Sequence, residues 1–300
     1  MNPSSLLRLL SLAAIWGASF LFMRQLVPEI GAMPTAFARV LLSSIGLAVI
    51  LLLMRRAWDF RGRLRKALLI GVVNSGIPVL MYCLAAQVLP AGYSAIFNAT
   101  TPLMGVIIGA LLFGEELTAA KAAGVLIGLA GVALLTGAGP VPFDAQLAWG
   151  AAACLVATAC YGLAGFLTRH WLNDGGALDS SVSAFGSQLG ATLFLLPIFA
   201  FSSLDMPLEP LLEPRIWLAL AGLGFLCTSF AYVLFFRLLA DIGPLKTLTV
   251  TFLIPPFGVL WGVLLLGESL SWAHLQGGLL IAVALWLVLR PTPAVAAQES

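Results

Sequence analysis

The sequence predicts an all-α integral membrane protein, with ten transmembrane helices arranged as two five-helix repeats of opposite topology around a central cavity. Three observations support this prediction: the composition of the chain, a segment that occurs twice, and the distribution of basic residues among the loops. Hydrophobic residues make up 61% of the 300 positions and charged residues 9%, and the mean hydropathy is +1.04. A soluble domain carries roughly 25% charged residues. The apolar runs lack two-residue alternation, which excludes a transmembrane β-barrel.

Ten apolar runs approach the roughly 20 residues that a helix needs to cross about 30 Å of hydrocarbon. They cover residues 6–24, 33–53, 67–89, 92–113, 119–137, 148–170, 178–202, 215–238, 244–266 and 271–289. Little chain remains between them, so no soluble domain is expected. The first run lacks a small-residue cleavage site, and nine runs follow it, so it is not expected to be a removable signal peptide. All four cysteines lie within runs, where neither disulfides nor metal sites are expected.

Residues 102–134 and 255–287 are two copies of one segment, 153 positions apart. Without gaps, 13 of 33 positions are identical. The shared residues include a proline, four glycines and a glutamate, at Pro102/Pro255, Gly105/Gly258, Gly109/Gly262, Gly114-Glu115/Gly267-Glu268 and Gly124/Gly277. A repeat dictates architecture. It predicts two units, residues 6–137 and 148–289, followed by a cytoplasmic tail, 290–300.

The basic residues predict the orientation. If the amino terminus is cytoplasmic, 12 of the 15 Lys and Arg residues fall on the cytoplasmic side, six of them in the loop 55–66. The positive-inside rule therefore places both termini in the cytoplasm, and the expected location is the inner (plasma) membrane. The two repeated segments are five helices apart, an odd number, so they end on opposite faces. Binding of anionic lipid headgroups is an alternative role for the basic loop; nucleic acid is not an expected partner.

Residues 16–20 (Trp-Gly-Ala-Ser-Phe), the Pro34…Ala38-Arg39 opening of the second run, and the Pro…Gly-Glu-x-Leu-Thr/Ser…Gly pattern that closes each unit resemble the EamA family. That family belongs to the drug/metabolite transporter (DMT) superfamily. The resemblance covers about residues 6–289. It implies a ten-helix exporter of amino acids, related metabolites or toxic organic compounds, and YddG-type members handle aromatic amino acids. It implies no cofactor.

Polar and aromatic residues in the spans identify candidate cavity walls, because polar groups in a membrane usually face a bundle interior or a wet cavity. They concentrate in the third and fourth helices of each unit, whereas the fifth and tenth helices are nearly free of them and are expected to serve packing. The candidate substrate-binding residues are Trp16, Arg39, Asn74, Tyr82, Tyr93, Asn98, Thr101, Tyr161, Thr228, Tyr232 and Thr251.

Pro102 and Pro255 occupy equivalent positions, each about halfway along its run. Proline removes a backbone donor and frees a carbonyl about one turn earlier. Corresponding breaks in both halves of a transporter point to its site. We therefore expect these breaks to border the cavity or to move during gating; kinks that serve only packing are the alternative.

Three charged residues have two possible roles each. Arg39 lies about two turns inside its helix and is either a receptor for a substrate carboxylate or a structural partner of backbone carbonyls and outer-loop acids, the simpler reading. Glu115 and Glu268 precede the potential helix caps Thr118 and Ser271. They are expected to anchor helix ends, with gating or proton handling as the alternative.

No Asp or Glu lies in the middle of a run, so no residue can be nominated for proton coupling. A neutral, aromatic cavity suits zwitterionic or apolar organic solutes, whereas phosphates would require several converging cations. The chain lacks a His-Glu-x-x-His motif and paired intramembrane aspartates, so an enzyme is not expected. The sequence thus predicts a secondary transporter that exports small molecules, amino acids above all, by alternating access. A multidrug exporter, a passive channel or a sensor are the alternatives, and the oligomeric state stays open.

Overall fold

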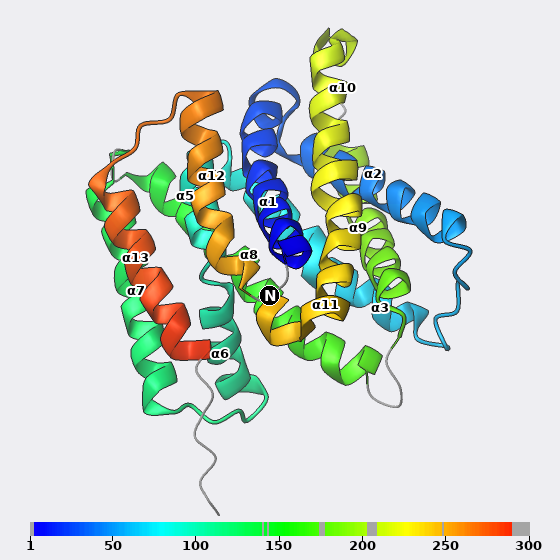
Figure 1. Cartoon of the computed structure of the whole chain (residues 1–300). Helices are drawn as coiled ribbons and strands as arrows, with labels where there is room; N and C mark the ends of the chain where they lie inside the picture. The colour runs from blue at the N-terminus through cyan, green and yellow to red at the C-terminus, as the bar shows by residue number, and fades with distance from the viewer. Residues whose placement is uncertain are drawn as a thin grey trace, which may run out of the picture.

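A computed structural model describes residues 3–139, 141–142, 144–173, 178–202, 209–247 and 249–289. Every regular element in these residues is a helix, so the described part of the chain is all-α (Figure 1). The predicted tail, 290–300, lies outside the described residues.

The first half of the chain contains α1 (Pro3–Ile30), α2 (Ala32–Leu53), α3 (Leu64–Gly71), η1 (Val72–Gly76), α4 (Ile77–Ala85), α5 (Ala91–Asn98), α6 (Thr101–Leu112) and α7 (Ala119–Ala138). The second half contains α8 (Ala145–Thr168), η2 (Arg169–Asn173), α9 (Ser180–Ser202), η3 (Glu209–Leu212), α10 (Pro214–Ala221), η4 (Gly222–Phe230), α11 (Ala231–Thr247), α12 (Val250–Leu266) and α13 (Trp272–Leu289). Within the described residues, eight helical stretches are long and apolar enough to cross a membrane, and two shorter apolar helices, Val250–Leu266 and Trp272–Val288, follow them.

Local sequence explains where several helices begin and end. Asp144 caps α8, because its Oδ1 accepts the backbone N–H of Leu147 at 2.8 Å. Pro214 opens α10, where its missing N–H costs nothing. The αL conformation of Gly267, with φ of +65°, ends α12.

One predicted boundary is wrong. The sequence predicts a loop between the runs 215–238 and 244–266, whereas α11 continues to Thr247 and α12 begins only at Val250. Asp241 in this helical extension forms an ion pair with Arg8 of α1, so the segment contacts the bundle.

Two π-helical segments, η1 and η4, interrupt the third helical stretch of each half. In η4 the hydroxyls of Thr228 and Ser229 donate to the carbonyls of Leu223 and Gly224, each five residues earlier, at 3.0 and 3.3 Å. A π-helix is wider than an α-helix and often marks a functional site. No feature of the apolar runs predicts these segments.

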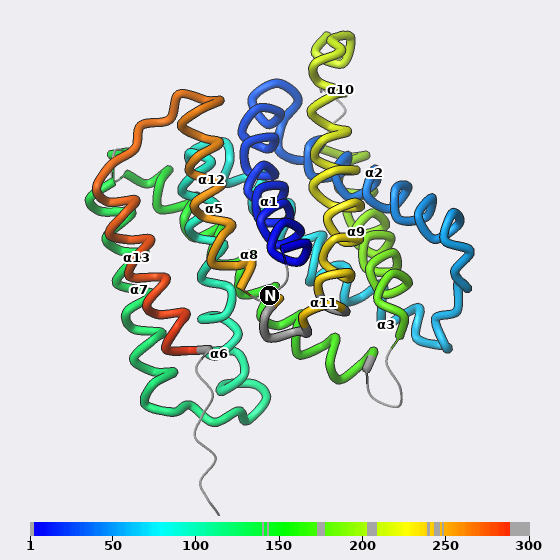
Figure 2. Tube along the Cα trace, viewed as in Figure 1, coloured from blue at the N-terminus to red at the C-terminus, as the bar shows by residue number. Residues whose placement is uncertain are grey.

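Glycines allow close crossings between the two halves. A Cβ on Gly17 of α1 would lie 2.9 Å from the backbone nitrogen of Gly258 in α12. Correspondingly, a Cβ on Gly162 of α8 would lie 2.9 Å from the backbone nitrogen of Gly105 in α6. Small residues bring membrane helices into backbone contact in this way. Figure 2 shows α1 between α12 and α11, and α7 beside α13, the pair predicted to serve packing.

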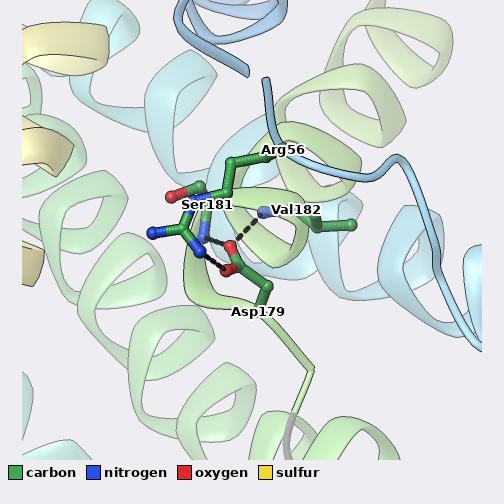
Figure 3. Close-up of polar contacts among 4 residues, drawn as sticks. All are labelled: Arg56, Asp179, Ser181 and Val182. Atoms are coloured by element: carbon green, nitrogen blue, oxygen red, sulfur yellow. Dashed lines mark hydrogen bonds and ion pairs between the residues drawn. The ribbon is translucent and has the colours of Figure 1, made fainter. Parts of the chain in front are cut away.

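A polar cluster joins the basic loop after α2 to the start of α9 (Figure 3). Asp179 Oδ1 accepts the backbone N–H groups of Ser181 and Val182 at 2.8 and 3.3 Å, and its Oδ2 lies 3.5 Å from Arg56 Nη1. Both charged side chains are exposed, so the ion pair contributes little to stability. It shows that one basic residue of this loop serves a helix end.

Candidate functional site

A cavity of about 560 Å³ lies among α1, α2, η1, α4 and the junction of α5 with α6 in the first half, and α8, α9, η4, α11 and α12 in the second. Its walls combine polar and aromatic side chains. Ten of the eleven predicted candidates line it: Trp16, Arg39, Asn74, Tyr82, Asn98, Thr101, Tyr161, Thr228, Tyr232 and Thr251. Residues from both halves therefore meet around one space, as expected from polar groups that avoid lipid.

Aromatic rings form one wall of the cavity. Tyr82 and Tyr161 stack with centroids 6.3 Å apart, and Phe20 meets Tyr82 edge-on at 5.3 Å. Trp16 lies 5.7 Å from Phe235. The Tyr82 hydroxyl donates to Asn98 Oδ1 at 3.1 Å, so this wall is held in place by ring packing and a hydrogen bond.

Arg39 brings a positive charge to the cavity. Its closest polar contacts are long: Nε donates to Thr228 Oγ1 at 3.4 Å, and Nη1 approaches Met23 Sδ at 3.5 Å. Among the described residues, neither a carboxylate nor a backbone carbonyl bonds to its guanidinium. A partly buried cation without such partners is costly in a membrane protein. The partners expected from the structural reading are therefore not found in this part of the chain.

Gln188 is a cavity residue that sequence reasoning missed. It lies on α9, is only 2% exposed, and its Nε2 donates to Ser75 Oγ of η1 at 2.9 Å. An amide in the middle of an apolar run was an available signal, since such groups rarely face lipid. Thr168 and Arg169 also line the cavity, at the end of α8.

Tyr93 was predicted to line the cavity, and the structure places it elsewhere. It is fully buried, and its ring meets that of His274 edge-on at 5.2 Å, between α5 and α13. Five residues separate Tyr93 from Asn98, which puts the two side chains about 140° apart around the helix. Because Asn98 faces the cavity, Tyr93 cannot.

The two equivalent prolines do not line the cavity. Pro102 is the second residue of α6, directly after the break between α5 and α6. There the Thr101 hydroxyl donates to the carbonyl of Asn98 at 2.8 Å, which satisfies an acceptor that the break frees. Pro255 lies within α12 rather than at a break, and it lines a separate apolar groove of about 510 Å³ against α13.

The repeated Gly-Glu pairs have one backbone geometry. Gly114 and Gly267 have φ of +66° and +65°, and the next residue, Glu115 or Glu268, donates its N–H to a carbonyl six positions earlier at 3.0 Å in both copies. Positive φ values favour glycine, which explains why glycine recurs. Thr118 then caps α7 by accepting the N–H of Lys121 at 3.3 Å.

The two glutamate side chains have different partners. Glu268 reaches the first turn of α5, where Oε1 accepts the N–H of Ala91 at 2.6 Å and Oε2 that of Gly92 at 3.1 Å. A carboxylate at a helix amino terminus is favourable. Glu115 instead pairs with Arg169 at 3.6 Å in an exposed contact. Glu268 thus joins the two halves of the chain through hydrogen bonds to a helix end.

In the described part of the chain, no three His, Cys, Asp or Glu side chains gather in a way that could hold a metal ion. The polar groups that line the candidate site are arginines, amides and the hydroxyls of tyrosine, serine and threonine.

Comparison with known proteins identifies the family. The model of the EamA-like transporter family matches residues 4–137 and 148–290. The chain belongs to this family. The resemblance to this family is therefore confirmed, and the protein is a multi-pass membrane transporter of the DMT type.

Individual relatives are distant but extend over much of the chain. An uncharacterized transporter of Bacillus subtilis, YoaV, is 22% identical over 285 residues, 94% of this chain and 95% of the relative. A probable terminal-alkyne amino-acid exporter of Streptantibioticus cattleyicolor is 26% identical over 203 residues, 68% of this chain and 65% of the relative. A crystal structure with 19% identity covers 96% of both chains at a TM-score of 0.63, which shows a shared fold.

Proposed function

We propose that this protein is a secondary transporter that exports amino acids with aromatic or other apolar side chains from the cytoplasm by alternating access. The observation that carries the proposal is Arg39, a cation without a bound carboxylate among the described residues, at the edge of a wall of tyrosines. A guanidinium recognises carboxylates through charge-assisted hydrogen bonds. A relative whose name describes an amino-acid exporter supports the substrate class.

In this proposal the substrate carboxylate binds Arg39, with the Thr228 hydroxyl beside it. The substrate side chain packs against Phe20, Tyr82 and Tyr161, whose rings bury apolar surface and allow stacking. Pockets that bind small molecules are commonly apolar with a few placed polar groups, and 560 Å³ is within their usual range.

The proposed mechanism rests on ten helices in two inverted units. The matched crossings at Gly17–Gly258 and Gly105–Gly162 support this arrangement, because each joins the first helix of one unit to the fourth of the other. With such units, each half can adopt the conformation of its counterpart, so the site can face either side in turn.

The two ends of the cavity support an inward-facing state. On the side of Glu268, the carboxylate links α5 to the α12–α13 connection. On the other side, the cavity reaches Arg169, whose side chain is 71% exposed. With both termini cytoplasmic, as the basic residues predict, the exposed end faces the cytoplasm. An exporter loads its substrate in this state.

Counterflow in proteoliposomes tests the function. Proteoliposomes that contain the purified protein and are loaded with unlabelled phenylalanine should accumulate labelled phenylalanine. A passive channel would only equilibrate the label across the membrane. Replacing Tyr82 or Asn98 by alanine should reduce the rate at least about tenfold, an effect of 1.4 kcal/mol. Val283→Ala, on α13 and away from the cavity, is the control. Equal losses in all variants, or no counterflow with any amino acid, would contradict the proposal.

Arg39→Gln tests the carboxylate contact separately. The variant should be produced and inserted normally yet lose phenylalanine binding, while Arg39→Lys should keep part of it because the charge remains. Loss of expression in both variants would instead support a structural role for Arg39.

Cysteine labelling tests the orientation. A membrane-impermeant reagent should reach cysteines placed at 55–66 only from the cytoplasm and a cysteine in place of Asp144 only from outside. The reverse pattern would end the inward-facing assignment.

A further inference from the structure

We propose that the cavity recognises its substrate as an anion, so that the carboxylate is required and the amino group is not. This inference rests on the proposed function and narrows its substrate class. The protein would bind aromatic and apolar monocarboxylates that lack an amino group at least as well as the corresponding amino acids, and it would reject organic cations.

The charges of the cavity are the first support. Arg39 and Arg169 line it, and none of its described lining residues is an Asp or Glu. Arg169 has a counter-charge at the exposed end, since Glu115 lies 3.6 Å away. Arg39 has none among the described residues, so the inner part of the cavity keeps a net positive charge. Within a membrane protein that charge acts over several ångströms, because little water screens it.

The hydrogen-bond acceptors of the cavity are the second support. An ammonium group has three N–H donors and needs acceptors. Asn98 already accepts at both oxygens, from the Tyr82 hydroxyl at Oδ1 and from the Thr101 hydroxyl at its carbonyl. The Leu223 carbonyl accepts from Thr228, whereas Gln188 Oε1 is a buried amide oxygen without a hydrogen-bond partner among the described residues. Among the described lining residues, an ammonium group would therefore find only neutral acceptors, several of them already hydrogen-bonded, and no carboxylate.

The consequence for a zwitterionic amino acid follows from these two facts. Its carboxylate meets Arg39, but its ammonium group meets the same positive charge without a carboxylate to balance it. Removing the amino group from the ligand removes that repulsion and costs few contacts. Removing the carboxylate leaves a cation beside Arg39. The order of affinity is then monocarboxylate, amino acid, amine.

Displacement of labelled phenylalanine from the purified full-length protein in detergent at pH 7.5 tests this order. Detergent avoids leakage of weak acids across a bilayer. The competitors are phenylalanine, 3-phenylpropanoate and phenethylamine, which share one ring and differ in their charged groups. We expect 3-phenylpropanoate to displace at or below the concentration of phenylalanine, and phenethylamine to need at least about tenfold more.

Three variants connect the order to Arg39. Arg39→Gln should weaken 3-phenylpropanoate at least about tenfold relative to phenethylamine, and Arg39→Lys should restore part of the difference. Arg56→Gln removes an equal charge from an exposed loop and should leave the order unchanged. If the Arg39→Gln variant is not produced, the displacement series on the unmodified protein still tests the expected order of affinity.

The outcomes separate the inference from the proposed function. If phenylalanine binds but 3-phenylpropanoate does not displace it, or if phenethylamine displaces it equally well, the inference is wrong and the amino-acid exporter stands. If labelled phenylalanine does not bind at all, the proposed function fails. Direct binding of labelled 3-phenylpropanoate, sensitive to Arg39→Gln, would then support anion recognition by itself.

Discussion

The Gly-Glu end of α6 and the Gly-Glu end of α12 are alike in sequence and backbone and different in partners. Both have a glycine with positive φ followed by a glutamate whose N–H bonds six residues back. Yet Glu268 binds the amino terminus of α5, whereas Glu115 pairs with Arg169 in solvent-exposed surroundings. The motif therefore supplies a carboxylate at a helix end, and the opposite half of the molecule determines what that carboxylate binds.

The difference also separates a strong contact from a weak one. Glu268 accepts two backbone N–H groups in a partly buried place, and hydrogen bonds to a charged group contribute about 1.5–3 kcal/mol each. The exposed Glu115–Arg169 pair contributes about 0–1 kcal/mol. In the proposed inward-facing state, the outer end is thus held more firmly than the cytoplasmic end.

The largest expected effect is that of Glu268→Ala. The variant leaves two N–H groups of α5 without their acceptor and should lower the free energy of unfolding by about 3 kcal/mol. Thermal unfolding in detergent measures it. Glu268→Gln keeps one acceptor oxygen and should recover part of the loss. If Glu268→Ala and Glu115→Ala lower the free energy of unfolding equally, the contact of Glu268 is not stronger than that of Glu115.

Gly262→Ala should destabilise through the same contact. A Cβ at Gly262 would lie 2.2 Å from Glu268 Oε2, so the carboxylate must move; at Gly109 the nearest atom is the movable Phe166 ring, 2.7 Å away. We expect a loss of about 1–3 kcal/mol for Gly262→Ala and less for Gly109→Ala. Combined with Glu268→Ala, the loss should be less than additive. Strict additivity would show that Gly262 does not act through Glu268.

Thiol accessibility tests which end is closed. A cysteine in place of Val79, which lines the cavity, should react with a membrane-impermeant reagent at least about tenfold faster from the Arg169 side than from the Glu268 side. The native cysteines are replaced beforehand, and reaction rates are measured in vesicles of both orientations. Glu268→Ala should reduce the ratio. A faster reaction from the Glu268 side would reverse the assignment.

The smallest expected effect is that of Glu115→Gln. Because its pair with Arg169 is exposed, the free energy of unfolding should change by less than about 1 kcal/mol, and the change should vanish at high salt. Arg169→Gln should give the same small value. A loss comparable to that of Glu268→Ala would show that Glu115 has a structural partner that the described residues do not include.

Much of the cavity wall could be predicted from the sequence. The apolar runs contain few polar residues, and polar side chains are unfavourable on the helix faces that contact lipid. Asn74, Tyr82 and Thr228 were found by this reasoning, and Gln188 could have been. Tyr93 was misplaced because a polar group within a run can also be buried between helices. Helical spacing from Asn98 would have separated the two only if the face of Asn98 had been known.

The prolines show a second limit of prediction from the sequence, which concerns the positions of helix breaks. Their equivalence in sequence predicts equivalent breaks, but Pro102 follows a break while Pro255 lies inside α12 and beside an apolar groove. A proline permits a break without determining its position, since neighbouring hydroxyls and the packing of the other half decide which carbonyls can remain without a helical partner. The π-helical segments η1 and η4 likewise left no signal in the apolar runs.

The sequence by itself determined the all-α membrane fold, the family and most of the cavity wall, because hydropathy and the repeated Gly-Glu segment are local properties. Only the tertiary structure decided the partners of its charges. Arg39 faces a cavity rather than an acid, Glu268 binds α5, and Glu115 pairs with an exposed arginine. These outcomes depend on which helix ends meet across the two halves. The two Gly-Glu pairs are nearly identical in local sequence, so the different partners of their glutamates are determined by the surrounding packing.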